Sequence, residues 1–253
     1  MIGPIARLRR QLRAPDWLRW LGRHELATLA VMAVAAGGIW LFALLAGEVM
    51  EGDTRAFDEA VLLAMRDPAD RSDPLGPKWV EEMGRDFTAL GGVGFLTLLT
   101  LAVVGYLVLE RKVGAALFIV AAVVGGRLLS AALKYGFDRP RPDLVPHGSF
   151  VYTASFPSGH SMLAAITYLT LGVLLARVQP RRALKAYILI LAIVVTVLVG
   201  ISRVYLGVHW PTDVLAGWTA GAVWAMACWL AVRWLQRRGE VEKDTDNPPG
   251  PDE

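Results

Sequence analysis

Six apolar segments constrain the fold of this chain more than any other feature. Each is close to the about 20 residues that a helix needs to cross the hydrocarbon core of a membrane. Within that core every backbone polar group has to be hydrogen-bonded inside the protein, so such segments are expected to be helical. The sequence therefore predicts an all-α, polytopic membrane helix bundle with six transmembrane helices, at Leu26–Gly47, Thr88–Leu109, Val113–Leu133, Ser161–Val178, Leu184–Ile201 and Val214–Leu235.

The composition agrees with a membrane protein. Hydrophobic residues make up 55% of the 253 residues and charged residues only 19%, which is too apolar for an ordinary soluble domain. The net charge of +3 is small and its basic residues form short clusters, so we expect no nucleic-acid partner. The single cysteine, Cys228, excludes an intramolecular disulfide and does not favour a thiolate metal site. We expect neither a metal nor a cofactor.

The basic clusters predict the orientation of the bundle, because short loops rich in Lys and Arg lie on the cytoplasmic side of a membrane. Residues 1–25 are basic and partly amphipathic, and we expect a cytoplasmic interfacial segment there, before the six-span domain of residues 26–238. The polar tail, residues 239–253, is expected to be disordered on the same side. The other clusters on this side are Arg111 and Lys112; Arg177, Arg181, Arg182 and Lys185; and Arg233, Arg237 and Arg238.

The long acidic connection of residues 48–87 then falls on the extracytoplasmic side. Within it Phe57, Val61, Leu62 and Met65 recur at helical spacing, which predicts a short amphipathic helix. Such a helix can lie on the membrane surface or pack over the protein as a lid, and the spacing leaves both open.

One charged residue interrupts the third apolar segment. Arg127 in lipid would cost about 3 kcal/mol or more, so we expect it to face the protein interior or a polar cavity. Its partner is not readable from the sequence.

A dense polar stretch, Ser202–Asp213, lies between the last two apolar segments. His209 and Asp213 are four positions apart, a spacing at which a carboxylate can orient an imidazole on one helical turn. Arg203 adds a permanent charge matched to a phosphoryl group. Taken alone, the stretch is also compatible with an interfacial loop whose polar side chains are solvated. With six spans, however, Lys134–Ser149 and Ser155–His160 fall on the same face, which gathers cations and imidazoles there.

These stretches carry three motifs in order. The first is a lysine followed after six residues by Arg-Pro, the second is Pro-Ser-Gly-His, and the third is Ser-Arg, five residues, His, three residues, Asp. They are Lys134 to Arg141-Pro142, Pro157-Ser158-Gly159-His160, and Ser202-Arg203 with His209 and Asp213. In these motifs the chain, from about residue 88 to 235, resembles the type 2 phosphatidic acid phosphatase superfamily of membrane lipid phosphatases.

The resemblance implies catalytic roles for three residues. His209 would be the nucleophile that forms a phosphohistidine, Asp213 would fix its tautomer, and His160 would protonate the leaving oxygen. Pro211 is tolerated in the first turn of a helix, so Asp213 is expected near the N-terminus of the last span. The alternative for His209 and His160 is that both are structural histidines.

Five further residues would bind phosphate: Lys134, Arg141, Ser158, Gly159 and Arg203. Cations neutralise the equatorial oxygens of the phosphoryl group, and a backbone free of side chains allows its close approach. Ser158 has the alternative role of a helix N-cap. Arg139-Pro140 duplicates the Arg-Pro pair, and the family spacing selects Arg141. Asp138 and Asp143 are expected to hold these arginines.

The resemblance implies metal-independent removal of a terminal phosphate from a membrane lipid at the extracytoplasmic face of the cytoplasmic membrane. The expected partners are membrane lipids and a lipid phosphate substrate: undecaprenyl diphosphate, phosphatidylglycerophosphate or phosphatidic acid. Three alternatives remain: a lipid phosphotransferase with the same phosphohistidine, a vanadate-dependent haloperoxidase, which six spans disfavour, and a non-enzymatic transporter or scaffold. The sequence does not give the oligomeric state.

Overall fold

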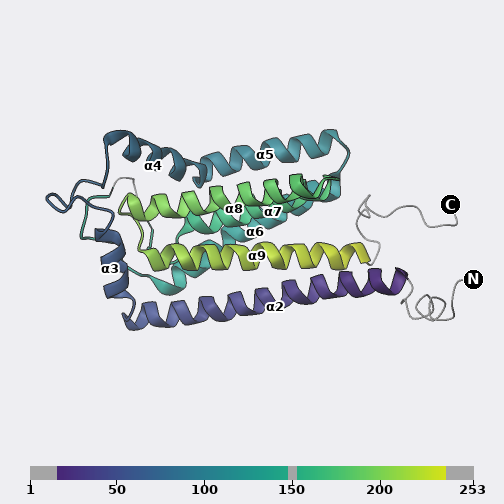
Figure 1. Ribbon diagram of the computed structural model, residues 1–253, viewed down its shortest axis with the longest axis horizontal. Coiled ribbons are helices and arrows are strands. Elements are labelled where there is room, and N and C mark those ends of the chain that lie inside the picture. The colour runs from purple at the N-terminus through teal and green to yellow at the C-terminus, as the bar shows by residue number, and fades with distance from the viewer. Residues whose placement is uncertain (1–15, 148–152, 238–253) are drawn as a thin grey trace, which may run out of the picture.

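The computed structural model describes residues 16–147 and 153–237, and within them the regular elements are helices that run mostly along one axis (Figure 1). The predicted N-terminal segment lies partly outside this range and the predicted C-terminal tail entirely so; residues 16–25 belong to the first helix. The helices are α2 (Asp16–Glu51), α3 (Arg55–Leu63), α4 (Lys78–Leu90), α5 (Val93–Leu109), α6 (Val113–Phe137), α7 (Gly159–Arg177), α8 (Arg182–Tyr205) and α9 (Pro211–Arg237).

The prediction of a polytopic helical bundle is confirmed. Five of the described helices, α2, α6, α7, α8 and α9, are each long and apolar enough to cross a membrane. The remaining predicted span, Thr88–Leu109, differs. It includes the end of α4 and all of α5, which meet at a bend of 50° and are long and apolar enough to cross a membrane only as a pair.

Gly91, at the bend, is closely packed. A Cβ atom there would lie 2.4 Å from Val199 Cγ1 and 3.2 Å from the His160 carbonyl oxygen. The α4–α5 junction therefore presses directly against α7 and α8. The sequence did not predict α4 because its apolar residues occupy only one face, whereas a membrane span is recognised by a continuous apolar run.

Helix α7 forms the centre of the bundle. It packs against α6, α8 and α9, and α2 packs against α9 on the outside. Gly217 lets α9 approach the start of α7, because a Cβ atom at this position would lie 2.7 Å from the Ser158 carbonyl oxygen. The packing therefore fixes the N-termini of α7 and α9 against each other.

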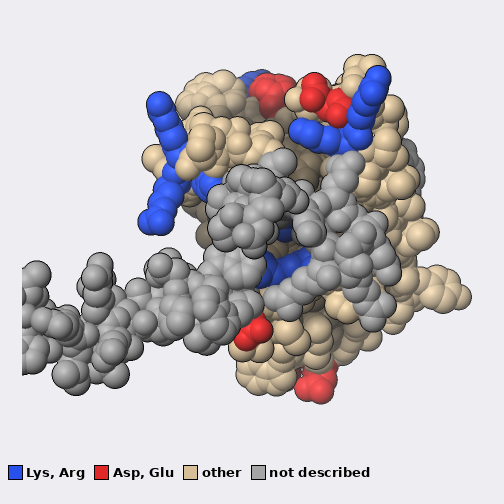
Figure 2. Space-filling model, turned by 90° about the vertical axis from the view of Figure 1, so that its right-hand side faces the viewer, with Lys and Arg blue, Asp and Glu red and all other residues tan. Residues whose placement is uncertain are grey.

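The two ends of the bundle differ in character. The ends of the described chain and the α5–α6 and α7–α8 connections lie at one end, whereas α3 and the α8–α9 connection lie at the other, here named the site end (Figure 1). Figure 2 shows Lys and Arg side chains projecting at the end opposite the site, where Arg111, Lys112, Arg181 and Arg182 are exposed. The basic clusters between the spans thus share one end, as the sequence predicted.

The expectation for Arg127 is wrong. Its side chain is exposed on α6 and has no hydrogen-bond or ion-pair partner within the described ranges. The neighbouring Gly126 takes the packed position instead, because a Cβ atom there would lie 2.4 Å from Ile166 Cδ1 and 3.3 Å from Trp224 Nε1. Arg127 is rotated by about 100° from that contact and faces outward.

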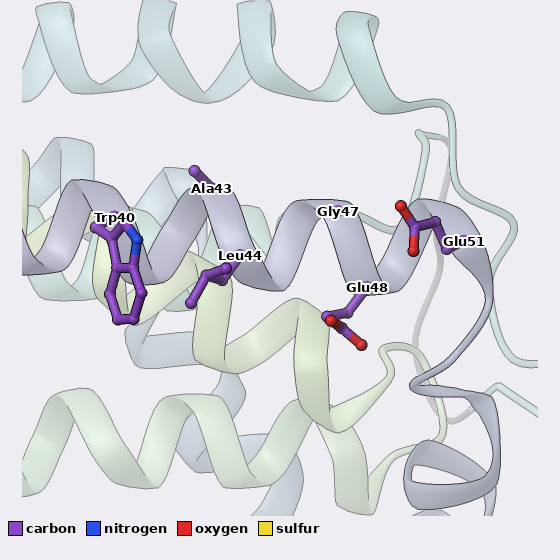
Figure 3. A pocket seen from close by; sticks show the side chains of 6 residues that line it. All are labelled: Trp40, Ala43, Leu44, Gly47, Glu48 and Glu51. Atoms are coloured by element: carbon purple, nitrogen blue, oxygen red, sulfur yellow. The ribbon is translucent and has the colours of Figure 1, made fainter.

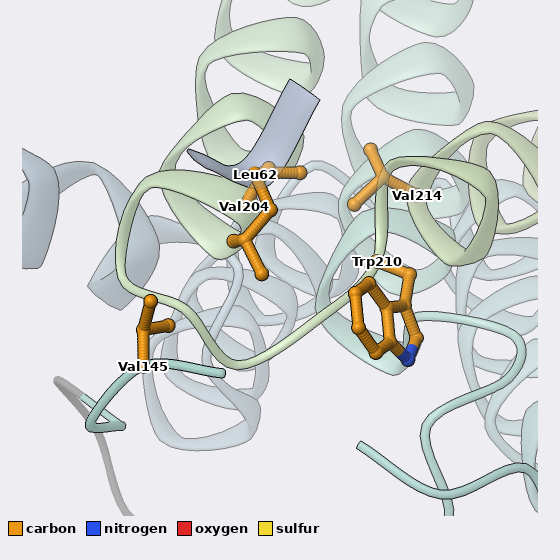
Figure 4. Packing of buried hydrophobic residues seen from close by; sticks show 5 residues of the cluster. All are labelled: Leu62, Val145, Val204, Trp210 and Val214. Atoms are coloured by element: carbon orange, nitrogen blue, oxygen red, sulfur yellow. The ribbon is translucent and has the colours of Figure 1, made fainter. Parts of the chain in front are cut away.

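Helix α3 lies where the spacing predicts an amphipathic helix in the long connection, and it packs on the protein. Leu62 is fully buried in a cluster with Val145, Val204, Trp210 and Val214 (Figure 4). Of the two alternatives, the structure therefore supports the packed helix, although Phe57 on its other face is 53% exposed.

Candidate active site

The three motif stretches meet at the site end. The Ser158 N–H donates to the Asp213 carbonyl oxygen at 2.9 Å, which joins the second motif to the third. Lys134 Nζ donates to the Ala154 carbonyl oxygen at 2.6 Å, which ties the first motif to the loop that precedes the second. Residues far apart in the sequence thus form one polar cluster.

His209 lies at the centre of this cluster and is 1% exposed. Its Nδ1 lies 3.3 Å from Asp213 Oδ2. Because a carboxylate only accepts hydrogen bonds, Nδ1 carries the ring proton and Nε2 presents a lone pair. Nε2 faces Arg141, whose Nη1 lies 3.1 Å away. This arrangement leaves the Nε2 lone pair directed at a cation.

Asp213 is fully buried and receives donors on both oxygens. Oδ2 accepts from the Trp210 N–H at 2.9 Å and from the Ser155 hydroxyl, in addition to facing His209. Oδ1 accepts from Arg139 Nη1 at 2.7 Å. Helix α9 begins at Pro211 with Asp213 in its first turn, as predicted. The donors hold the carboxylate in a single orientation toward the imidazole.

Three cations in the cluster have no carboxylate partner in the described part of the chain. Lys134 bonds only to a carbonyl oxygen; Arg141 donates to the carbonyl oxygens of Val208 at 2.6 Å and Thr153 at 2.8 Å. Arg203 is 1% exposed, donates to Thr88 Oγ1 at 2.7 Å and leaves its Nε without a partner. Burial lowers the pKa of Arg141, and its guanidinium is within electrostatic range of the other two cations. A cluster of cations without carboxylate partners favours the binding of an anion.

The two arginines of the first motif differ in their partners. Arg139 forms ion pairs with Asp58 and Asp213, both at 2.7 Å, whereas Arg141 contacts His209 and carbonyl oxygens. The expectation that Asp138 and Asp143 hold these arginines is wrong, because both carboxylates are exposed and a buried carboxylate from α3 takes their place.

The second motif forms the start of α7. Ser158 is its N-cap, and the Ser158 hydroxyl oxygen accepts from Ser161 N at 3.5 Å and Ser161 Oγ at 2.9 Å, so its structural role is realised. A Cβ atom on Gly159 would lie 3.3 Å from Lys134 Cε. His160 is partly exposed and lies within electrostatic range of Arg203 and His209. The proposed phosphate and proton-transfer roles of these residues stay predictions.

The sequence reasoning missed several residues of the site. Ser155 falls inside a stretch that it singled out, but belongs to none of the motifs. Thr88, which holds Arg203, was placed at the start of the predicted span Thr88–Leu109 without a role in the site. Asp58 accepts from Thr212, 154 positions away in the sequence, and no local pattern reports such a contact.

The electrostatics of His209 give a testable pH dependence. Burial lowers the pKa of His209 to about 3, with Arg203 and Arg141 acting in the same direction and Asp213 opposing them. The unfolded-state pKa is about 6.5, so the unfolded chain binds a proton that the folded chain does not. Stability is therefore lost as the pH falls from about 6.5 toward 3. In histidine-selective NMR we expect the signal that disappears in His209→Asn to stay neutral from about pH 8 to 5; a midpoint near 6.5 would contradict this.

A shallow hollow on α2 lies outside the cluster. It is lined by Trp40, Ala43, Leu44, Gly47, Glu48 and Glu51, all from one helix (Figure 3). Its two carboxylates would repel a phosphate, so it is not the anion site. Among the described residues no group of three or more His, Cys, Asp or Glu is arranged to hold a metal ion.

Comparisons with known proteins point in the same direction as this geometry. The family model of the PAP2 superfamily matches residues 113–237. A phosphatidylglycerophosphatase B of Bacillus subtilis (strain 168) is 37% identical over 186 residues, covering 71% of this chain and 85% of that protein. An undecaprenyl-diphosphatase of Sulfolobus acidocaldarius is 37% identical over 118 residues, covering 44% of this chain and 52% of that protein.

A solved structure is also similar. The crystal structure of a transmembrane PAP2 type phosphatidylglycerolphosphate phosphatase from Bacillus subtilis superimposes with a TM-score of 0.71 at 32% identity. The match covers 80% of this chain and 98% of that chain. The similarity therefore extends over nearly all of the other protein.

Proposed function

Because the chain belongs to the PAP2 superfamily, we propose that it is a membrane lipid phosphatase that removes a terminal phosphate through a phosphohistidine on His209. The proposal rests on the groups that surround the His209 imidazole. Its Nδ1 faces a carboxylate, its Nε2 faces Arg141, and Arg141, Lys134 and Arg203 have no carboxylate partner among the described residues. A phosphoryl group supplies the negative charge that these cations lack.

In the first step the Nε2 lone pair attacks phosphorus. His160 takes up a proton from solvent when the anionic phosphate binds beside it, because a nearby negative charge favours the cationic imidazole. The N–P bond forms as the bond from phosphorus to the lipid oxygen breaks, and His160 gives its proton to that oxygen. Arg141 Nη1 exchanges its contact with Nε2 for a phosphate oxygen, where it neutralises charge together with Lys134 and Arg203. Asp213 stabilises the positive charge that develops on the imidazole.

In the second step water attacks the phosphohistidine. His160, now neutral, takes the proton of the water, the N–P bond breaks, and free phosphate leaves. Residue His209 returns to its neutral form with the proton on Nδ1. No atom in either step requires a metal ion.

The substrate class follows from the site and the relatives together. A site at the mouth of a helix bundle lets the acyl or prenyl chain stay in lipid while the phosphate enters the cation cluster. Phosphatidylglycerophosphate and undecaprenyl diphosphate, suggested by the names of the relatives, and phosphatidic acid all present a terminal phosphoryl group. We place residues 26–238 in the cytoplasmic membrane with the site on the extracytoplasmic face, because the basic clusters lie at the other end.

The test is phosphate release by the purified protein in detergent with EDTA present. The three lipids are assayed in parallel, and we expect release from at least one of them that survives chelation. Labelled substrate with added sugar or lipid acceptors separates hydrolysis from transfer. No release from any lipid by a folded protein, with label in an acceptor, would replace the phosphatase with a phosphotransferase.

A further inference from the structure

A buried carboxylate from α3, outside all three motifs, contacts the start of α9. Asp58 is fully buried, and its Oδ1 accepts from the Thr212 N–H at 2.9 Å. Its Oδ2 accepts from Thr212 Oγ1 at 2.7 Å and from Arg139 Nη2 at 2.7 Å. The first N–H groups of a helix have no partner within it, so Asp58 caps α9 from another helix.

Arg139 joins this carboxylate to the one beside His209. Its Nη2 pairs with Asp58 and its Nη1 with Asp213, each at 2.7 Å. The guanidinium also lies over the Trp210 ring, 5.7 Å from its centroid, and is only 11% exposed. Asp58, Arg139, Asp213 and His209 therefore form one continuous buried chain of charged and polar contacts.

The chain of contacts constrains Asp213 in two ways. Arg139 occupies Oδ1 and so leaves Oδ2 to face the His209 imidazole. Asp58 shares the charge of Arg139, so Asp213 is not neutralised by a guanidinium of its own. Asp213 thus keeps the negative charge that stabilises a cationic imidazole.

The packing of α3 against the protein fixes the position of Asp58. Leu62 lies one helical turn after Asp58 on the same face, and its side chain enters the cluster with Val204, Trp210 and Val214 (Figure 4). An apolar contact and a charged contact on successive turns thus attach α3 to the segments that flank His209.

We propose that Asp58 is a positioning residue of the reaction, acting through Arg139 on the orientation and charge of Asp213. The proposal rests on the proposed function of His209 and Asp213. It makes α3, from the long connection after the first span, a part of the catalytic apparatus.

The experiment compares Asp58→Asn with Glu59→Gln, a matched change at the neighbouring carboxylate, which pairs only with Arg55 at the surface. We expect Asp58→Asn to lower kcat by about 10- to 100-fold with KM changed less than about threefold, and Glu59→Gln to leave both unchanged. Asp58→Asn combined with Arg139→Gln should be no slower than the slower single variant, because both interrupt one chain. An unchanged kcat, an effect confined to KM, or multiplying effects would each overturn the proposal.

Two further measurements keep the test decisive. If Asp58→Asn does not fold, Arg139→Lys breaks the same chain with its charge retained, and it should show the same loss in kcat; an unaffected kcat would overturn the proposal. If the wild type releases no phosphate from any lipid, the proposed function fails, but the positioning is still read by NMR. The His209 imidazole signal should then shift in Asp58→Asn and not in Glu59→Gln, and an unshifted signal would overturn it.

Discussion

Replacement of His209 by alanine should lower phosphate release by about 10⁴-fold or more, the largest effect of any single change in the chain. The variant loses Nε2, the imidazole nitrogen whose lone pair faces Arg141. It leaves Asp213 with its other donors, Trp210 N–H, Ser155 and Arg139, so the surrounding fold should persist. The measurement is turnover of the best lipid substrate, with binding of a non-hydrolysable analogue as evidence that the cation cluster is intact.

The matched control is His24→Ala, which removes a histidine from α2 at the end opposite the site. It should retain full turnover. Rapid acid-free quenching with labelled lipid should trap label on the wild type and on His24→Ala, and not on His209→Ala. Near wild-type turnover by a correctly folded His209→Ala would rule out the phosphohistidine.

How much of this site can be predicted from the sequence depends on how far apart in the chain the contacting residues are. His209 and Asp213 are only four positions apart, and Pro211 marks where α9 begins, so a local pattern is sufficient to pair them. The six apolar segments are likewise recognisable from their length and composition. Features of this kind need no knowledge of which helix lies beside which.

The features that were missed depend on packing between distant segments. At the α4–α5 bend Gly91 packs closely against Val199, and Arg127 is exposed while the neighbouring Gly126 takes the packed face. Arg139 and Arg141 have the same local sequence, Arg-Pro; the family spacing selects Arg141, but the different partners of the two arginines are visible only in the structure. One is ion-paired to Asp58 and Asp213, and the other lies beside His209.

This difference between the two arginines also bears on function. A cation whose charge is already matched by carboxylates is suited to hold structure, and one without such a partner is suited to bind an anion. In the proposed mechanism one Arg-Pro pair fixes the geometry of Asp213 and the other binds the phosphoryl group. The charge of each carboxylate near His209 is therefore as important as that of the cations.

The Asp213→Asn substitution tests this charge directly, and we expect kcat to fall by about 10³- to 10⁴-fold. Both oxygens of Asp213 accept hydrogen bonds, Oδ1 from Arg139 and Oδ2 from His209, Trp210 and Ser155. An asparagine has to turn its NH₂ group toward one of these two sets of donors. If the NH₂ group points toward Arg139, two hydrogen-bond donors face each other. If it points toward His209, it donates to Nδ1, and the ring proton moves to Nε2, the atom proposed to attack phosphorus.

Asp143→Asn is the control for this change, because Asp143 is an exposed carboxylate near the site without a role in the cluster. It should leave kcat within about twofold of the wild type. In NMR, Asp213→Asn should lose the Nδ1-protonated tautomer of His209, whereas Asp143→Asn should keep it. If Asp213→Asn kept both the tautomer and a kcat within tenfold of the wild type, the charge of Asp213 would not control the reactivity of His209. Asp213 would then have a structural role, as the acceptor of hydrogen bonds from Ser155 and Trp210.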